Sequence, residues 1–406
     1  MTSHGPLAAS PPERLHALDA VRALALLLGV AFHATMSYLP GAQYLWIASD
    51  GDQTVVLSVL FYVVHLFRMT VFFVIAGFFG RMALERLGTM AFARDRFKRI
   101  VVPLLSAWPL VFTGIVAAVV WGAYVKNGGS FPKESPPGPA FTPSDFPLTH
   151  LWFLYVLSLL YLGALALRTL VARLDRKGLL RAGVDACMRA LVKPWAPLLL
   201  AVPVAICLST LPKWLPWFGI PTPDHSLYPN LAASVGFGVA FGFGWLLQRQ
   251  PKLLELIAHF RWWNLGLAVA ATIVCFVMVG LNPALKLSLD EGTKLAYAFS
   301  YGVASWAWSL TLIGLTLRFL SSYNATWRYL ADASYWVYIV HLPLVMALQV
   351  AASQLAWPWW IEYPSLLAIA FALMLGSYHL MVRHSFIGAT LNGRRVPRAA
   401  APGRPQ

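Results

Sequence analysis

Charged residues are scarce in this sequence. Asp, Glu, Lys and Arg together make up 12% of its 406 residues, whereas a soluble domain carries about 25%. Hydrophobic residues make up 59%, and the mean hydropathy is +0.64. This composition excludes an ordinary soluble enzyme. It predicts an all-α polytopic membrane protein, because a helix satisfies its own backbone hydrogen bonds inside a lipid bilayer.

Patterns that bind metals, phosphates or cofactors are also missing. The three cysteines, Cys187, Cys207 and Cys275, share no motif spacing, so the sequence predicts neither a disulfide framework nor a zinc site. It contains no Gly-rich phosphate loop, no internal repeat, no pair of carboxylates suited to glycoside chemistry and no metal-ligand helix motif. We therefore expect no metal ion and no tightly bound cofactor.

Ten apolar segments come close to the length that spans about 30 Å of hydrocarbon. They cover residues 20–39, 55–80, 100–124, 150–168, 195–211, 230–248, 263–281, 295–317, 333–355 and 363–382. The fifth segment is short and interrupted by proline, so it is the weakest of these predictions. The sequence therefore predicts about ten transmembrane helices.

Most Lys and Arg residues fall on one side of this predicted topology. If the N-terminus is cytoplasmic, 25 of the 31 lie on the cytoplasmic side, as the positive-inside rule requires. We therefore expect cytoplasmic N- and C-termini, with a short tail over residues 1–18, a transmembrane domain over 19–382 and a basic, disordered tail over 383–406. The net charge of +15 then reflects topology and contact with anionic lipids, not a nucleic-acid partner.

The first predicted helix, from Asp19 to Pro40, carries ionisable residues along one face. At about 100° per residue, Arg22 and His33 lie within roughly 20° of one another, and Asp19 lies nearby. An ionisable side chain inside a membrane is costly and by default marks a functional site. This polar face therefore predicts a site along the first helix.

The second span carries His65 and Arg68, three residues apart and hence on one face. Arg68 cannot lose its proton. It must therefore be paired with a carboxylate or with backbone carbonyls, face water, or bind an anion. Few acidic residues lie within the spans, which favours a functional Arg68. His65 alone fits a core histidine equally well.

Two further spans carry polar and aromatic candidates. His150 and Trp152 open the fourth span at the outer interface, where an aromatic belt would also account for Trp152. Tyr338 and His341 share a face of the ninth span, where a hydrogen-bonded core pair is as compatible with the pattern as a direct role. These residues are candidates for substrate binding.

The loop after the second span is strongly basic. Arg94, Arg96 and Arg99 follow one another there and, together with Arg22, could form a cytoplasmic site for a nucleotide phosphate. The positive-inside rule accounts for most of this charge as well. A buried histidine can act as a general base or a nucleophile, and an arginine can hold a carboxylate or an oxyanion. Acyl transfer across a membrane and proton-coupled transport both fit these groups.

Four stretches of the chain resemble the membrane acyltransferase-3 family. Arg22 and His33, separated by ten residues in the helix that begins LDAVRALALLLG, resemble its R-x10-H signature. The remaining stretches resemble blocks of the branch that succinylates periplasmic glucans: HLFRMTVFFVIAGFF at 65–79, THLWFLYVL at 149–157 and DASYWVYIVHLPL at 332–344. The resemblance extends from Leu18 to the last span.

This resemblance implies an enzyme of the bacterial inner membrane. It would take an acyl group, succinyl in this branch, from cytoplasmic acyl-coenzyme A and pass it to hydroxyls of periplasmic β-glucan. His33 would be the general base or transient acyl carrier, Arg22 its motif partner and Arg68 a second essential arginine. The coenzyme A site would contain Arg22, Arg94, Arg96 and Arg99, and the substrate site His65, His150, Trp152, Tyr338 and His341.

Two alternatives remain compatible with the sequence. One is an acetyltransferase that modifies another surface polysaccharide. The other is a secondary transporter of a sugar or of an acylated intermediate, for which buried histidine and arginine residues are equally suitable.

Overall fold

The computed structural model describes residues 16–41, 46–48, 52–133, 138–285 and 289–393. Within these ranges every regular element is helical, as predicted, apart from one isolated bridge between Thr142 and Asp145. The α-helices are α1 His16–Ala34, α2 Val55–Leu87, α3 Thr89–Arg96, α4 Val102–Lys126, α5 Trp152–Leu174, α6 Leu179–Leu191, α7 Ala196–Ser209, α8 Leu231–Leu247, α9 Leu253–His259, α10 Arg261–Val279, α11 Glu291–Phe319, α12 Ala325–Ala352, α13 Trp359–Ser377 and α14 Phe386–Asn392.

Each of the ten predicted spans overlaps one of these helices. In the described part of the chain, seven helical segments are long and apolar enough to cross a membrane, or eight if the bent pair α6 and α7 forms one span. The two remaining predicted spans are α8, which has only 17 residues, and α11. Helix α11 buries Ser305, Ser309 and Thr311 against its neighbours, so it is less apolar than a lipid-facing span.

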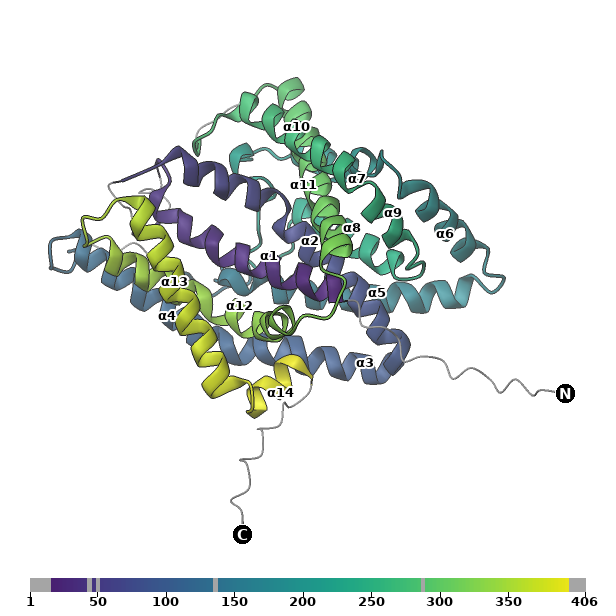
Figure 1. Ribbon diagram of the computed structural model, residues 1–406, viewed down its shortest axis with the longest axis horizontal. Coiled ribbons are helices and arrows are strands. Elements are labelled where there is room, and N and C mark those ends of the chain that lie inside the picture. Colours follow the sequence, from purple (N-terminus) through teal and green to yellow (C-terminus); the bar gives the residue numbers. More distant parts are fainter. Residues whose placement is uncertain (1–15, 42–45, 49–51, 134–137, 286–288, 394–406) are drawn as a thin grey trace, which may run out of the picture.

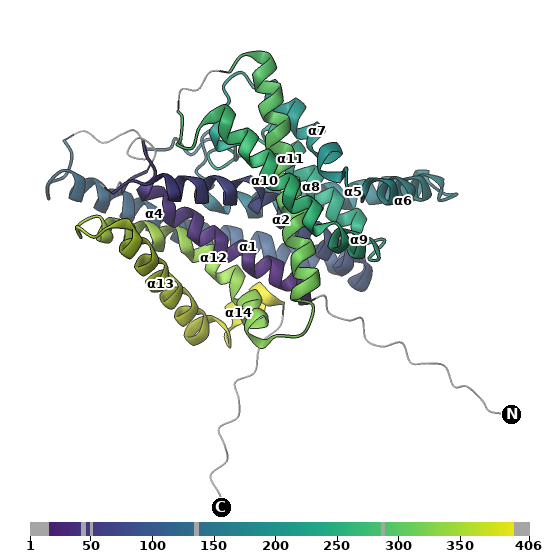
Figure 2. The ribbon, with the colours of Figure 1, turned by 45° about the horizontal axis from the view of Figure 1, so that its top comes forward.

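Helices α1 and α2 lie at the centre of the bundle (Figure 1). Helix α1 packs against α2, α11, α12 and α13, and α12 in turn packs against α4. On the other side, α2 packs against α8, and α11 packs against α7 and α10. Helix α6 projects from the side of the bundle (Figure 2). The three helices that carry the predicted ionisable residues, α1, α2 and α12, are therefore brought together.

Glycines allow α2 and α8 to touch backbone to backbone. A Cβ atom on Gly77 of α2 would lie 2.0 Å from the Phe241 carbonyl oxygen, and one on Gly244 of α8 would lie 1.9 Å from the Val74 carbonyl oxygen. Small residues at such a crossing let membrane helices associate closely, where van der Waals packing is a main source of stability. This contact fixes α2, and with it His65 and Arg68.

Two predicted boundaries differ from the structure. The first helix begins at His16, its α-helical part ends at Ala34, and a 3-10 turn follows over Thr35–Tyr38. The prediction of a disordered tail from residue 383 is wrong for α14. Ser385 caps this helix by accepting from the Ile387 amide, and Leu391 is buried. An N-cap and a buried apolar residue stabilise a helix of this length. Residues 1–15 and 394–406 of the predicted tails lie outside the described ranges.

Candidate active site

A cavity of about 1250 Å³ runs through the bundle. One end, which we call the basic end, is lined by Arg22, Arg96 and Arg99. The opposite end, which we call the loop end, is lined by residues of the segment 213–225 between α7 and α8. The middle of the cavity is lined by ionisable side chains from α1, α2 and α12 and from the 3-10 turn Thr149–Leu151 before α5: His33, His65, Arg68, His150 and His341. One space thus contains the ionisable residues that the sequence placed on four separate spans.

Arg68 lies in the cavity without an acidic partner among the described residues. Its Nη1 donates to the carbonyl of Gly29 at 3.3 Å, and its guanidinium lies 4.3 Å from the centre of the Phe32 ring. Its Nε is buried and has no hydrogen-bond partner in the described part of the chain. The hydrogen bond and the cation–π contact hold the group in place and leave most of its donors free for an anion.

His33 lies at the last turn of α1, where carbonyl groups lack helical donors. Gln349 of α12 supplies them, because its Nε2 donates to the carbonyls of His33 at 3.0 Å and Ala34 at 3.1 Å. The Trp46 indole donates to Gln349 Oε1 at 2.9 Å and fixes the orientation of the amide. The backbone of His33 is thus held by side chains, while its Nδ1 is buried and has no partner within the described ranges.

A proline in α12 determines how His150 binds. Pro343 has no amide N–H, so the Ile339 carbonyl four residues earlier has no helical donor. His150 Nε2 lies 3.2 Å from this oxygen and 3.1 Å from the Tyr338 carbonyl oxygen. In return, the Tyr338 hydroxyl donates to the His150 carbonyl at 2.8 Å. These reciprocal bonds join the start of the fourth span to α12.

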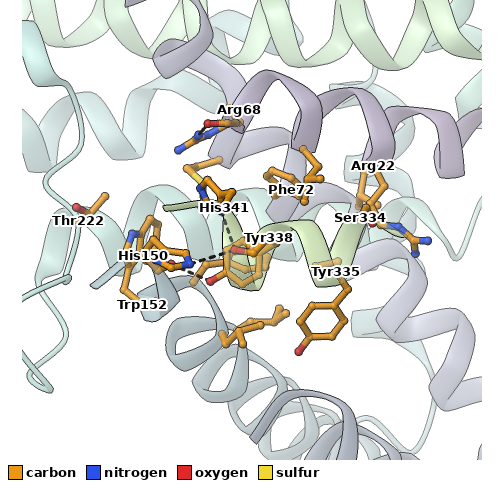
Figure 3. A pocket seen from close by; sticks show the side chains of 18 of the residues that line it. Arg22, Arg68, Phe72, His150, Trp152, Thr222, Ser334, Tyr335, Tyr338 and His341 are labelled. Atoms are coloured by element: carbon orange, nitrogen blue, oxygen red, sulfur yellow. Dashed lines mark hydrogen bonds between the residues drawn. The ribbon is translucent and has the colours of Figure 1, made fainter. Parts of the chain in front are cut away.

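His341 lies next to both His150 and His33 of α1. Its Nδ1 lies 2.7 Å from the Tyr338 carbonyl oxygen, so the predicted pairing of Tyr338 and His341 runs through the backbone and not through the phenol. Figure 3 shows the hydrogen bonds that join His150, Tyr338 and His341. The His341 ring lies 4.8 Å from that of His150 and 5.1 Å from that of His33, measured between ring centres. Three imidazoles therefore follow one another across the cavity.

His65 and Trp152 also line the cavity but are held by packing. The His65 ring lies nearly parallel to the Phe32 and Phe61 rings, at 5.3 and 5.6 Å between ring centres, and these two rings stack on each other at 4.2 Å. The His65 Nε2 lies 2.7 Å from the Phe218 carbonyl oxygen. Trp152 stacks on a neighbouring ring of α8 at 5.4 Å. Both positions shape the walls of the cavity and leave few free polar atoms.

The predicted cluster of basic residues is only partly formed. Arg22 Nη2 donates to the Ala331 carbonyl at 2.8 Å and lies 3.7 Å from Asp19 Oδ1. Arg96 and Arg99 line the basic end with it, but Arg94 is exposed and does not line the cavity. The segment is helical, so Arg96 lies about 200° around the helix axis from Arg94. Arg94 therefore does not belong to the predicted phosphate site.

The residues at the loop end were not among those predicted from the sequence. Lys213, Thr222, Asp224 and His225 line the cavity there, and Phe218 reaches inward to the contact with His65. A signal was present in the sequence, because the stretch PWFGIP is too apolar and aromatic for a loop exposed only to water. Among the described residues, no three His, Cys, Asp or Glu side chains are grouped so as to hold a metal ion.

Comparison with known proteins identifies the family. A family model described as "Acyltransferase domain", of the acyltransferase-3 type, matches residues 15–379. The chain belongs to this family. The match covers every helix from α2 to α13, and it also covers both residues of the R-x10-H signature, so the resemblance drawn from the motifs is confirmed.

Curated relatives match a shorter region. Glucans biosynthesis protein C of Escherichia coli strain SMS-3-5 is 33% identical over 148 residues, which is 36% of this chain and 37% of the relative. The protein of the same name from Escherichia coli strain K12 is 32% identical over the same number of residues, with the same coverage. The matched region thus spans 37% of the length of these relatives. No solved structure matches the chain.

Proposed function

We propose that this protein is an O-acyltransferase of the bacterial inner membrane that moves a succinyl group from cytoplasmic acyl-coenzyme A to hydroxyls of periplasmic β-glucan. The observation that carries this proposal is the cavity, which runs from the basic end through His33 and Arg68 to the loop end. The family supplies the reaction class, and the name of the partial relatives suggests the glucan acceptor.

The basic end suits the nucleotide part of coenzyme A. Arginines bind phosphates through several hydrogen bonds at once, and Arg22, Arg96 and Arg99 line this end together. Arg22 and His33 are eleven residues apart on α1, which corresponds to about 16 Å at 1.5 Å per residue. The extended pantetheine arm can span that distance and bring the thioester to His33.

His33 then serves as the base. One ring nitrogen takes the proton of a glucosyl hydroxyl, the hydroxyl oxygen bonds to the thioester carbonyl carbon, the C–S bond breaks, and the thiolate takes the proton back from His33. In the alternative route a ring nitrogen of His33 attacks the thioester carbonyl carbon, the C–S bond breaks and the thiolate leaves. The glucosyl hydroxyl oxygen then takes the acyl group from His33, and the hydroxyl proton passes to the thiolate. Both routes end with a succinyl ester on the glucan and free coenzyme A.

Arg68 provides positive charge beside His33. Its free donors can stabilise the oxyanion that forms on the thioester carbonyl, or they can hold the terminal carboxylate of the succinyl group. An Arg68→Lys variant separates these roles, because lysine keeps the charge but cannot form two parallel hydrogen bonds. Loss of transfer with succinyl-coenzyme A, together with retained transfer with acetyl-coenzyme A, would assign Arg68 to the carboxylate.

The decisive experiment uses purified full-length protein in detergent, where transport across a membrane is impossible. Labelled succinyl-coenzyme A and a β-glucan oligosaccharide are supplied, and the product is weighed by mass spectrometry. We expect the mass of a succinyl ester, formed about 100-fold or more slowly by His33→Ala. An acetyl mass, obtained only from acetyl-coenzyme A, would indicate the acetyltransferase. Absence of transfer from every donor would favour a transporter.

A further inference from the structure

The Nδ1 atom of His33 is a buried polar atom whose partner remains to be identified. It has no hydrogen bond to any described residue, although Gln349 binds the carbonyls of His33 itself and of Ala34. A buried polar atom without a partner costs about 1–3 kcal/mol, so such an atom at a catalytic base calls for an explanation. A partner that appears in the working state would supply one.

His341 offers a matching acceptor. Its Nδ1 faces the Tyr338 carbonyl, and a carbonyl oxygen only accepts, so this nitrogen carries the proton of the neutral ring. The lone pair of the ring is therefore on Nε2, since Nδ1 alone makes the bond to the Tyr338 carbonyl. The ring lines the cavity, and its centre lies 5.1 Å from that of His33.

Carboxylates in the cavity do not lie where they could accept a hydrogen bond from His33. In serine hydrolases a carboxylate accepts from the catalytic histidine and fixes its tautomer. Here the acids that line the cavity lie at its ends: Asp19, Asp95 and Asp332 with the arginines of the basic end, and Asp224 at the loop end. The middle of the cavity contains imidazoles and a guanidinium.

We propose that His341 is a positioning residue that accepts a hydrogen bond from Nδ1–H of His33 through its own Nε2. This inference rests on the proposed function and adds to it how the base is oriented. With ring centres 5.1 Å apart, rotation of the rings can bring the two nitrogens to hydrogen-bond distance, in keeping with catalytic hydrogen bonds that tighten only when substrate is bound. The bond keeps the lone pair of His33 on Nε2 and available to the glucosyl hydroxyl. The Tyr338 carbonyl holds His341 in turn.

Two amide variants test this arrangement. In His341→Gln the amide oxygen can occupy the position of Nε2 and accept from His33. In His341→Asn the shorter side chain can replace only Nδ1 and its bond to the Tyr338 carbonyl. Full-length purified variants are compared for transfer from labelled succinyl-coenzyme A to glucan oligosaccharide. We expect Asn to lower kcat by about 100-fold, a typical contribution of a general base, with KM unchanged and most of kcat restored by Gln.

A double variant separates positioning from a structural role. Because His341 acts through His33, adding His341→Asn to His33→Ala should lower the residual rate no further. Equal kcat values for the Gln and Asn variants, or an additive loss in the double variant, would overturn the inference. If the Asn protein does not fold, as judged by size-exclusion chromatography, His341→Ala replaces it, because alanine also lacks an acceptor.

A chemical modification that does not require catalysis tests the His33–His341 contact separately from the proposed acyltransferase function. Diethyl pyrocarbonate modifies the lone-pair nitrogen of a histidine, and mass spectrometry locates the modified residue. We expect His33 to react several-fold more slowly in His341→Asn than in the unmodified protein and in His341→Gln. Equal rates would refute the His33–His341 contact, whereas failure of the unmodified protein to transfer any acyl group would refute the proposed function alone.

Discussion

The guanidinium of Arg68 lies directly against the backbone of Gly29 on the neighbouring helix. Its Nη1 is 3.3 Å from the Gly29 carbonyl oxygen and would be 3.1 Å from a Cβ atom at this position. Glycine is the only residue that leaves this space empty, although it is a poor helix former in the interior of α1. The position of a charged group in the cavity therefore depends on the missing side chain of its neighbour.

Gly29→Ala should consequently separate stability from activity. Alanine favours the helix by about 1 kcal/mol over glycine, so the melting temperature should stay the same or rise. The new methyl group displaces the flexible end of Arg68, so we expect kcat for acyl transfer to fall several-fold. Thermal unfolding and initial rates on the same preparation check both. Unchanged kcat would show that the Gly29 contact does not position Arg68.

Arg99 and Arg94 form a matched pair at the predicted coenzyme A site. Arg99 lines the basic end, whereas Arg94 on the same helical segment is exposed outside the cavity. A hydrogen bond to a charged group contributes about 1.5–3 kcal/mol. Arg99→Gln should therefore raise KM for acyl-coenzyme A about tenfold or more, while Arg94→Gln leaves it unchanged. A similar rise for both variants would indicate general electrostatic attraction instead of a binding site.

Local periodicity predicted the parts of this site that lie on single helices. The 100° step placed Arg22 with His33, and His65 with Arg68, and each pair does line the cavity. The step would also have separated Arg94 from Arg96 and Arg99. This separation was not predicted, because the segment was interpreted as a loop. In the structure it is helical, since α3 continues through the π-helical turn Phe97–Val101 into α4.

Helix periodicity could not predict contacts between segments that are distant in the sequence. One of the two acceptors of His150, the Ile339 carbonyl, is free only because Pro343, almost two hundred residues after His150, removes its helical donor. No spacing rule relates the two positions. The same holds for Gln349, whose amide binds the end of α1, and for the carbonyl of Phe218, which meets His65. Such pairs follow from the packing of whole helices, which a single sequence does not specify.

The role assigned to Pro343 can be tested by restoring the missing amide. In Pro343→Ala the new N–H can donate to the Ile339 carbonyl and compete with His150 Nε2. The alanine keeps the Cβ atom that faces Gly114 of α4, so packing there is preserved. We expect equal or greater thermal stability and a lower transfer rate, because His150 loses an acceptor. A variant with full activity would show that the bond from His150 to α12 is dispensable.

The crossing of α2 and α8 gives a prediction with an internal control. A Cβ atom on Gly244 would collide with the Val74 carbonyl, whereas one on Gly242, two residues earlier on α8, meets no atom within 4 Å. Gly244→Ala must push the two backbones apart, and overpacking of this kind costs about 1–3 kcal/mol. Gly242→Ala should be neutral or stabilising, since alanine is the better helix former.

Thermal unfolding of both variants in detergent measures this difference, and the transfer rate measures its consequence. Because α2 carries His65 and Arg68, separating it from α8 moves both side chains relative to His33 on α1. Gly244→Ala should therefore lose activity as well as stability, in contrast to Gly29→Ala, which loses activity alone. Equal melting temperatures for the Gly244 and Gly242 variants would mean that the close backbone contact contributes nothing to holding α2 in place.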